Sequence, residues 1–338
     1  MAKFLNVHAG GIGGRPIELV TCESLADPAK ATDCATEFIQ QDVVITVAGE
    51  TTAIGTMWQS LHDAGIPVFL YGTTEQSVIL DPDSTFVLGD LIAGLGTLPI
   101  TVAKENKVGK VTVVAIDVPV VTGFYDAVGD QVFGDAGLDL QVVRIPPDQA
   151  DMTPQMARIA AGEPTEVHII GSDTFCISAF NGLRAASFTG PIGVVSQCVS
   201  DSSRKALGDA FDGVYTSTPF AVGDTENIDM SQWRAIVAAY DETDIDLSNS
   251  MGPTIYFTMT ALSRALDGIS GDITPARITE KIKSAPKLPL PAAPGLTFQC
   301  DGSANPLVPA ACSRGALLTT LDSDGEPTLP YRSFGTAG

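Results

Sequence analysis

Short apolar runs alternate with longer segments along most of the chain. Most of the short runs are rich in Val and Ile and are apolar at consecutive positions, which is typical of strands that are covered on both faces. Such strands belong inside a sheet with helices on either side, so the pattern indicates an α/β protein. The expected strands are residues 17–21, 43–47, 68–71, 111–116, 140–145, 166–170, 192–195 and 213–217.

The segments between these runs are long enough for crossover helices. Asp27 followed by Pro28 is typical of an N-cap and a first helical residue. Gly65, Ile66 and Pro67 end one helix and lead into the next strand. The sequence therefore predicts a series of βαβ units, which implies parallel sheets with right-handed crossovers. The expected helices are residues 27–40, 52–64, 91–106, 124–136, 153–161 and 178–187.

The series is interrupted twice, which indicates two lobes. A new run of βαβ units begins after residues 85–89, and the pattern turns helical after Pro219 and Phe220. The later elements are expected as helices at residues 230–240, 253–266 and 275–284, a Pro-rich stretch at 285–294, and short strands around 296–300 and 314–322. The first lobe is expected to comprise residues 1–88 plus 220–284, and the second lobe residues 89–219 plus 285–338.

Length and charge exclude several classes of protein. The 338 residues suffice for two cores. Forty acidic residues against 19 basic ones give a net charge of −21, which would repel phosphate backbones, so we expect no nucleic-acid partner. No apolar run of about 18 residues is present to span a membrane. The N-terminus lacks the apolar region of a signal peptide, so an exported protein with this sequence would have lost its leader.

Six cysteines fall in three neighbouring pairs, 12, 22 and 12 positions apart. They form no CxxC and the chain has three His, so a zinc site is a poor explanation. Although fifteen pairings are formally open, the clustering favours Cys22–Cys34, Cys176–Cys198 and Cys300–Cys312. Three such bridges would indicate an oxidising compartment. The alternative is six buried free thiols in a cytosolic protein.

No motif in the sequence indicates catalysis, a metal or a cofactor. The glycine-rich residues 10–14 follow a helix-like segment and precede a strand-like one, which is the reverse of a phosphate-binding loop, so we interpret them as a helix end and turn. His8, His62 and His168 have no metal-ligand spacing. There is no GxxxxGK[ST], HExxH or GxSxG. We therefore expect no enzyme, no metal and no cofactor.

Polar residues follow several of the expected strands. In open α/β sheets, ligands bind beyond the carboxyl ends of the parallel strands. Two of these ends carry paired threonines just before a helix, Thr51 with Thr52 and Thr73 with Thr74. Helix amides and threonine hydroxyls make an uncharged site for a carboxylate. The alternative for each pair is simple helix capping.

Several segments in order resemble one family. Residues 4–19 contain an Asn6…Gly10-Gly11-Ile12-Gly13-Gly14-Arg15-Pro16-Ile17-Glu18-Leu19 pattern, and Asp27-Pro28-Ala29 follows. Both resemble segments of the ABC-transporter solute-binding proteins of the branched-chain amino-acid type. Residues 47–49, 65–68, 210–214 and 256–266 are similar to later segments of that family, so the resemblance covers nearly the whole chain.

The resemblance implies a type I periplasmic-binding-protein fold, in which two doubly wound parallel-sheet lobes are joined by a three-crossing hinge and close on a ligand. The family's first strand would precede Ala2 and is missing from this sequence. The implied ligand-binding residues are Thr51, Thr52, Tyr71, Thr73 and Thr74 in the first lobe, Asp117, Phe175 and Gln197 in the second lobe, and Tyr256 on a helix near the cleft.

The second lobe departs from the family pattern. Val120, Val121 and Thr122 follow Asp117 where the amino-acid binders place a Tyr, and Ser196 and Gln197 stand where they place an acid. The ammonium-binding end therefore differs, and a carboxylate without an amine or a neutral polar compound becomes a candidate ligand. A Cys176–Cys198 bridge would brace two of the second-lobe strand ends.

The principal hypothesis is a monomeric binding protein that carries an amino acid or small carboxylate to an ABC-transporter permease. It would be extracellular or periplasmic, its leader removed, and would meet the membrane only through a lost lipid anchor or by docking on the permease. One alternative is a ligand-sensing regulator of the same fold. An α/β enzyme is the third hypothesis, against which the lack of catalytic motifs counts.

Overall fold

A computed structural model describes residues 1–25, 27–49, 53–90, 92–240, 245, 252–306 and 308–335. The chain divides into two compact units. Unit 1 comprises Met1–Leu91 and Pro219–Arg314, and unit 2 comprises Ile92–Thr218 and Gly315–Thr336. Within the described residues, no helix combines the length and the apolar character that crossing a membrane requires.

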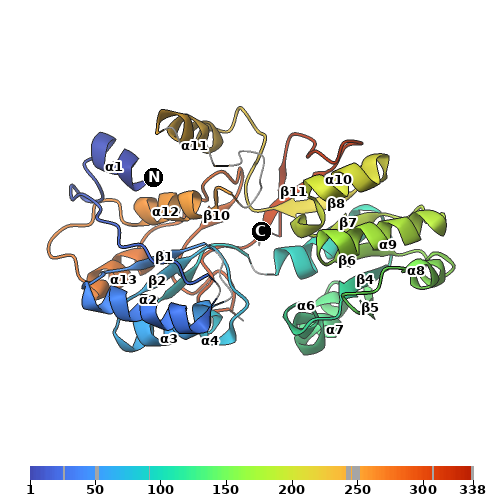
Figure 1. The fold of residues 1–338 in the computed structure, drawn as a ribbon, viewed down its shortest axis with the longest axis horizontal. Coiled ribbons are helices and arrows are strands. Elements are labelled where there is room, and N and C mark those ends of the chain that lie inside the picture. Colours follow the sequence, from blue (N-terminus) through green and yellow to red (C-terminus); the bar gives the residue numbers. More distant parts are fainter. Residues whose placement is uncertain are drawn as a thin grey trace. The chain divides into compact units, whose positions relative to one another are not determined.

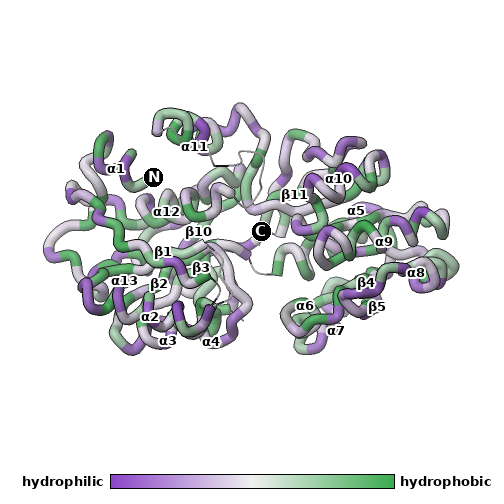
Figure 2. Tube along the Cα trace, in the orientation of Figure 1, coloured by the Kyte–Doolittle hydropathy of each residue, from purple (hydrophilic) through white to green (hydrophobic). Residues whose placement is uncertain are grey.

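Unit 1 is built on a parallel sheet whose three strands, β1 (Thr46–Ala48), β2 (Val68–Leu70) and β3 (Thr85–Val87), lie in that order. Helices α2 (Pro28–Gln40) and α3 (Ile54–Asp63) pack against one another and cover one face of the sheet (Figure 1). Their apolar sides meet Val68 and Leu70 of β2. Figure 2 shows hydrophilic and hydrophobic residues mixed along α2 and α3, as expected for helices with one covered face.

The prediction of a strand at residues 17–21 was wrong. The segment forms no ladder within the described residues. The backbone of Ile17 is bound by one side chain: Asn6 Nδ2 donates to Ile17 O at 2.8 Å, and Asn6 Oδ1 accepts from Ile17 N at 2.7 Å. Leu19 is 56% exposed. A strand needs a neighbouring strand for its hydrogen bonds, and the apolar composition of this segment could not show whether one was present.

Among the described residues, unit 1 has five further helices, of which α1, α11 and α12 contribute to an aromatic cluster. They are α1 (Ala2–His8), the short α4 (Gln76–Ile79), α11 (Ile228–Ala239), α12 (Thr254–Ala265) and α13 (Pro275–Lys283). Phe257 of α12 lies with its ring centroid 4.7 Å from that of Phe220 and 6.3 Å from that of Trp233 of α11. The predicted cap of α2 is confirmed, since Asp27 Oδ1 accepts from Ala29 N at 2.8 Å, and α13 is capped in the same way by Thr274.

Residues 285–314 lie in unit 1, whereas the sequence had placed them in the second lobe. This stretch contains the antiparallel pair β9 (Leu288–Pro289) and β10 (Thr297–Phe298). Ala292 O accepts from Ala221 N at 2.8 Å, and Ala310 O accepts from Val87 N at 2.8 Å. These contacts with distant parts of unit 1 hold the Pro-rich stretch, and they could not be read from local sequence because the stretch has almost no regular structure of its own.

Unit 2 is built on one seven-stranded sheet in the order β12-β11-β8-β7-β6-β4-β5. The strands β4 to β8 are parallel, and β11 and β12 are antiparallel to their neighbours. Their bounds are β4 Lys110–Ile116, β5 Asp139–Ile145, β6 Glu166–Ile170, β7 Ile192–Val194, β8 Tyr215–Thr218, β11 Ala316–Thr320 and β12 Arg332–Phe334. The sequence predicted all of them except β12.

The helices of unit 2 cover both faces of this sheet. Val167 and Ile169 of β6 face a core that includes α9, whereas α5 packs on the opposite face. Two expected helices contain a wide π-helical turn. In the helix expected at 91–106, η1 precedes α5. The helix expected at 124–136 begins earlier, at Pro119, and η2 separates α6 from α7. The bounds are η1 Ala93–Thr97, α5 Leu98–Glu105, α6 Pro119–Phe124, η2 Tyr125–Gly129, α7 Asp130–Asp135, α8 Thr153–Ala160, α9 Asp173–Ala185, η3 Ser196–Cys198, α10 Asp201–Leu207 and η4 Gly208–Phe211.

The three cysteine pairings expected from the spacing are confirmed. Cys22 is bonded to Cys34, Cys176 to Cys198, and Cys300 to Cys312. Cys22–Cys34 ties the segment before α2 to that helix, and Cys300–Cys312 closes a loop of unit 1. Cys176–Cys198 lies in unit 2 and joins α9 to η3. Each bridge therefore lies inside one unit.

Candidate ligand-binding faces

The carboxyl ends of parallel strands meet at one edge of a sheet, and each unit has one such edge. In unit 1, β1 ends at Ala48 and is followed by Gly49. The predicted ligand residues Thr51 and Thr52 follow directly and lie outside the described residues. The second strand end of this unit, after β2, carries Tyr71, Thr73 and Thr74.

Tyr71 is fixed at the carboxyl end of β2. Its backbone N donates to Ala48 O at 3.2 Å, and its carbonyl accepts from Gly89 N at 2.7 Å. Its ring centroid lies 5.4 Å from that of Phe220. A side chain at position 89 would have no room, because a Cβ there would lie 2.9 Å from Tyr71 Cζ. Tyr71 is thus a half-buried, immobilised residue at the edge of this face.

The two threonines after β2 have different surroundings. Thr73 Oγ1 accepts from Glu75 N at 3.1 Å, so its hydroxyl closes a local turn, as the capping alternative expected. Thr74 is exposed. Of the two hydroxyls, that of Thr74 is therefore the better candidate for contact with a solute.

The start of α12 lies beside the end of β1, since a Cβ at Gly49 would touch Thr254 Cγ2 at 3.6 Å. The predicted ligand residue Tyr256 is two positions further on, and its side chain is buried at 8% exposure in the cluster with Phe257 and Trp233. Burial, with the nearby Asp229 carboxylate, raises the pKa of Tyr256 to about 12. Tyr256 therefore packs in the core of unit 1 beneath α11.

In unit 2, Asp117 and Gln197 lie at strand ends as expected, and both are exposed. Asp117 follows β4, and its backbone N donates to Ile145 O of β5 at 2.8 Å. Gln197 follows β7 inside η3, and its Oε1 accepts from Ser196 Oγ at 3.4 Å. Both side chains are therefore accessible to solvent at this edge of the sheet.

Phe175, by contrast, points inward. It is 2% exposed and belongs to the apolar core of unit 2. A Cβ at Gly171 would lie 2.4 Å from Phe175 Cδ1, so the ring fills the space under the turn that leads into α9. Its position in the sequence, three residues after the N-cap Ser172, is that of a core residue of the first turn and not of an exposed strand end.

The sequence interpretation missed Asp173 and its two serine partners. Asp173 Oδ2 accepts from Ser200 Oγ at 3.3 Å and also from Ser202 Oγ, while Asp173 Oδ1 accepts from Thr174 N at 2.7 Å. The Ser202 hydroxyl, followed by the Thr174 amide, holds the pKa of the Asp173 carboxyl below its usual range. The signal was present as two hydroxyl-rich stretches, residues 172–174 and 200–203, one after β6 and one after β7.

The strand-end segments of unit 2 carry acids and hydroxyls but no basic residue. The segments that follow β4, β5, β6 and β7, up to the first residue of the next α-helix, contain no Lys or Arg. Their acids are Asp117, Asp148, Asp151, Asp173 and Asp201. Carboxylates and hydroxyl oxygens accept hydrogen bonds, so this face is suited to a ligand group that donates them, such as a hydroxyl or an ammonium. In the described part of the chain no group of three or more His, Cys, Asp or Glu is arranged to hold a metal ion.

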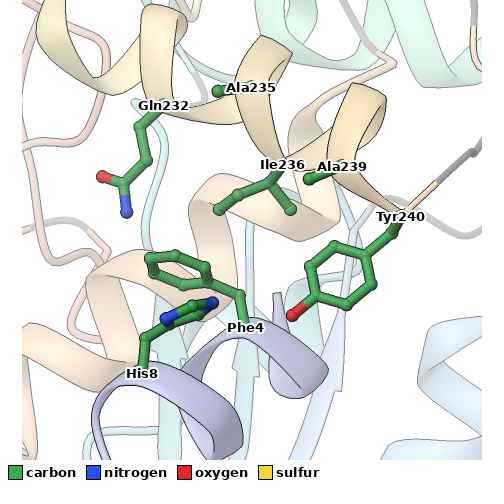
Figure 3. Close-up of a pocket in the computed structure, with 7 residues that line it drawn as sticks. All are labelled: Phe4, His8, Gln232, Ala235, Ile236, Ala239 and Tyr240. Carbon is green, nitrogen blue, oxygen red and sulfur yellow. The ribbon is translucent and has the colours of Figure 1, made fainter.

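A separate cavity of about 400 Å³ lies between α1 and α11 in unit 1. Figure 3 shows Phe4 and His8 of α1 on one side and Gln232, Ile236 and Tyr240 on the other. The Phe4 and His8 rings pack against each other with centroids 5.0 Å apart. None of these residues follows a parallel strand, so the cavity is distinct from the strand-end face.

Comparisons with known proteins agree with this architecture. A family model described as periplasmic binding protein matches residues 2–324. No curated protein sequence matches the chain. Among solved structures, an ABC transporter substrate-binding protein from Sphaerobacter thermophilus superposes with a TM-score of 0.73 at 21% identity, covering 99% of this chain and 91% of that chain.

Two further structures contain a ligand. The branched-chain amino acid transporter substrate-binding protein of Streptococcus pneumoniae, in complex with isoleucine, has a TM-score of 0.70 at 14% identity, covering 98% of this chain and 91% of that one. An ABC-transporter solute-binding protein of R. palustris, in complex with 4-hydroxybenzoate, has a TM-score of 0.68 at 18% identity, covering 98% and 88%. These likenesses show a shared fold.

Proposed function

The chain belongs to the periplasmic binding protein family and has its type I fold, and from that premise we propose that it binds a small polar solute at the strand-end residues and delivers it to an ABC importer. Members of this family are transport substrate-binding proteins and not enzymes, and the family implies an extracellular or periplasmic location. The observation that carries the proposal is the set of acids and hydroxyls without bases at the strand ends of unit 2.

The proposed solute is a small carboxylate with a hydrogen-bond donor at its other end. The relatives with bound ligand hold isoleucine and 4-hydroxybenzoate, which share a carboxylate and differ in the donor, an ammonium in one and a phenolic hydroxyl in the other. The Thr74 hydroxyl, with Thr51, Thr52 and the backbone of Thr73, would receive the carboxylate. Asp117 and Gln197 would accept from the donor.

Aromatic residues have a smaller part in this proposal than the sequence suggested. Phe175 and Tyr256 are at most 8% exposed, so neither ring offers a surface to a solute without moving. Tyr71 is the half-buried aromatic side chain at a strand end, and its position is fixed by backbone hydrogen bonds on both sides. Recognition is therefore proposed to be mainly polar, with Tyr71 contributing the apolar contact.

A thermal-shift screen tests the proposal. The panel comprises branched-chain amino acids, small aliphatic carboxylates, aromatic acids with a ring hydroxyl, and polyols as uncharged controls. A ligand that binds only the folded chain raises the melting temperature in proportion to the logarithm of its concentration over Kd. A rise with one carboxylate class and none with polyols supports the proposal. No rise with any class would contradict it.

Variants of the strand ends locate the site once a solute is found. T74V removes the exposed hydroxyl, and D117A removes the acid after β4. Each is expected to weaken binding roughly tenfold, the loss typical of one hydrogen bond to a charged group. T36V, on the exposed side of α2, is the matched control, since Thr36 Oγ1 bonds only to Thr32 O within the described residues at 3.0 Å. Equal loss in T36V would argue against the assignment.

Delivery to a permease, a monomeric state and attachment to the membrane by a lipid anchor are parts of the same proposal. The family's transport role supports the permease partner. The measurement is ATP-driven uptake of the identified solute into vesicles that carry the cognate permease, with and without this protein. Uptake that does not depend on the protein would contradict the delivery role while leaving solute binding intact.

A further inference from the structure

Two ionisable side chains of unit 2 are completely buried and adjacent. Glu166 and His168 lie two positions apart on β6, so they share one face of the sheet, and each is 0% exposed. His168 Nδ1 is 3.6 Å from Glu166 Oε1. A Glu side chain is almost never fully buried unless it is paired. Neither belongs to the strand-end face described above.

The second ring nitrogen of His168 fixes where one hydrogen lies. His168 Nε2 is 2.8 Å from the carbonyl oxygen of Gly94 in η1. A carbonyl can only accept, so Nε2 carries a hydrogen and donates it. His168 Nδ1 therefore faces Glu166, and one further proton is left to be divided between these two groups.

The surroundings of the pair are built to fit it, and within the described residues the backbone amide of Gly193 is the other polar group that acts on Glu166, outside hydrogen-bond geometry. A Cβ at Gly193 of β7 would lie 2.6 Å from Glu166 Oε1 and 2.8 Å from His168 Nδ1, so the glycine leaves the space that the pair occupies. Both carboxyl oxygens and His168 Nδ1 lack a hydrogen-bond partner in the described residues.

The ionisable groups of the surrounding elements do not neutralise the pair. Tyr125 of η2 donates to Leu95 O at 2.7 Å, and burial followed by the influence of Glu166 raises the pKa of Tyr125 well above its usual range, so it stays neutral. Lys104 is exposed and Glu105 binds Arg332 at the end of α5.

On β4 and β5, the charged groups either lie on the far face of the sheet or have a partner of their own. Lys110 and Asp139 are register partners on the opposite face of the sheet from Glu166. Arg144, at the edge strand β5, is bound to Asp126. The charge of the pair must therefore be balanced within the pair.

We propose that Glu166 and His168 hold one shared proton as a neutral pair, with Glu166 as the carboxylic acid facing Nδ1, and that this pair anchors the Gly94 carbonyl of η1. Two opposite charges at a site without solvent would need several hydrogen bonds to offset the cost of removing them from water, and neither group has a hydrogen-bond partner in the described residues. A neutral carboxylic acid and a neutral imidazole carry no charge, so the contact between them requires no further polar group. Burial, which raises the pKa of Glu166, acts in the same direction.

The pair would hold the first turn of unit 2. Residues Ala93–Thr97 form η1, the first element after the chain leaves unit 1, and its wide turn leaves carbonyls open to side chains. His168 takes the carbonyl of Gly94, and Tyr125 takes that of Leu95. A protonation-dependent anchor at this place would make the start of unit 2 sensitive to pH, which goes beyond the proposed solute binding.

Thermal denaturation of E166Q tests the proposal, with E163Q at the exposed Glu163 as the matched control. Gln has nearly the same shape as protonated Glu, and its amide N–H can donate a hydrogen bond as the carboxylic acid O–H does. If Glu166 is neutral, E166Q melts no lower than E163Q at neutral pH. If Glu166 is ionised, E166Q leaves His168 without its counter-charge and melts lower by roughly 5–10 °C. A fall of that size, or failure of E166Q to fold, overturns the proposal.

The pH profile and an infrared spectrum provide independent readouts. A carboxyl whose pKa is raised on folding stabilises the folded state at low pH and loses that contribution as pH rises above the ordinary Glu range. The melting temperature of E166Q relative to E163Q should therefore climb with pH. The wild-type infrared spectrum at neutral pH should contain the carbonyl band of a protonated carboxylic acid, absent in E166Q. A flat profile or a missing band overturns the proposal.

Discussion

The sulfur of Cys198, at the end of η3, is bonded to the sulfur of Cys176 in the first turn of α9. The segments that follow β6 and β7 are thereby joined covalently. Asp173 adds a second connection between the same segments by accepting from the hydroxyls of Ser200 and Ser202. This part of the strand-end face of unit 2 is therefore assembled before any solute arrives, which lowers the entropy cost of binding.

Removal of this bridge in C176A/C198A is expected to weaken solute binding. Without the cross-link, the segments that carry residues 176 and 198 would have to be ordered when the solute binds. The unfolded state would also gain conformational entropy, which lowers the free energy of unfolding by roughly 2–4 kcal/mol. C22A/C34A, which removes a bridge of unit 1, is the control. Both variants should melt lower, but only C176A/C198A should show a larger Kd. Equal Kd values in the two variants would contradict the bracing role.

Substitution of Gly89 should disturb Tyr71. A Cβ at position 89 would lie 2.9 Å from Tyr71 Cζ and 3.0 Å from its carbonyl oxygen, so G89A must displace the ring or the end of β2. Overpacking of this kind costs about 1–3 kcal/mol, measured by urea denaturation. G109A is the control, because nothing lies within 4 Å of a Cβ at Gly109. A G89A variant as stable as G109A would show that Tyr71 is not held as described.

Asp81 is the centre of a buried hydrogen-bond network in unit 1. It accepts from Thr85 Oγ1 at 2.6 Å and from Ser84 Oγ at 3.0 Å, and Thr85 Oγ1 in turn accepts from Trp58 Nε1 at 2.7 Å. Burial alone would raise the pKa of Asp81, but the hydrogen bonds from Thr85, Asp83 and Ser84 outweigh it and hold the pKa below its usual value. The ionised carboxylate is therefore the stabilising form.

A group with a lowered pKa stabilises the fold above its unfolded-state pKa and loses that contribution as pH falls through its folded-state pKa. D81N should thus be less stable than wild type by about 1–3 kcal/mol at neutral pH, with the difference shrinking in acid. Equilibrium unfolding of D81N and of D63N, at the exposed end of α3, over a range of acidic pH checks this. A difference that is constant with pH would contradict the network's ionised state.

Asp229 of α11 holds the Pro-rich stretch against unit 1. Its Oδ1 accepts from Arg264 Nη2 at 2.5 Å, and its Oδ2 accepts from Ala292 N at 2.8 Å. D229A leaves Arg264 without its carboxylate and the Ala292 amide without its acceptor, and should cost about 1–3 kcal/mol. Hydrogen exchange at Ala292 should rise in D229A and stay low in D267A, at the exposed end of α12. Unchanged exchange at Ala292 in D229A would show that Asp229 does not hold the Pro-rich stretch.

The sequence predicted those parts of the fold whose signals are local. Consecutive apolar residues located β4 and β6, and the Asp27-Pro28 pair located the start of α2 within one residue. It failed where a segment depends on distant partners. Residues 17–21 have the composition of a strand but no neighbouring strand among the described residues, and residues 285–314 join unit 1 through backbone contacts with Val87 and Ala221.

The candidate site was predictable only in part. Position after a strand located Tyr71, Asp117 and Gln197 at strand ends, because parallel topology alone determines where such residues lie. The position of a residue in the sequence could not show whether its side chain points into the core or towards a ligand. Phe175 and Tyr256 are buried inside the first turns of α9 and α12, whereas Asp173 meets Ser200 and Ser202 across a gap of 27 or more residues in sequence.

Titration calorimetry with the solute that raises the melting temperature most tests the central claim most directly. The account predicts saturable binding of one molecule per chain to the wild-type protein. It also predicts that binding is weakened strongly in the double variant T74V/D117A and unchanged in T36V. Absence of saturable heat, or an affinity that is the same in wild type and T74V/D117A, would contradict the claim that this chain is a solute-binding protein whose ligand meets the strand-end residues.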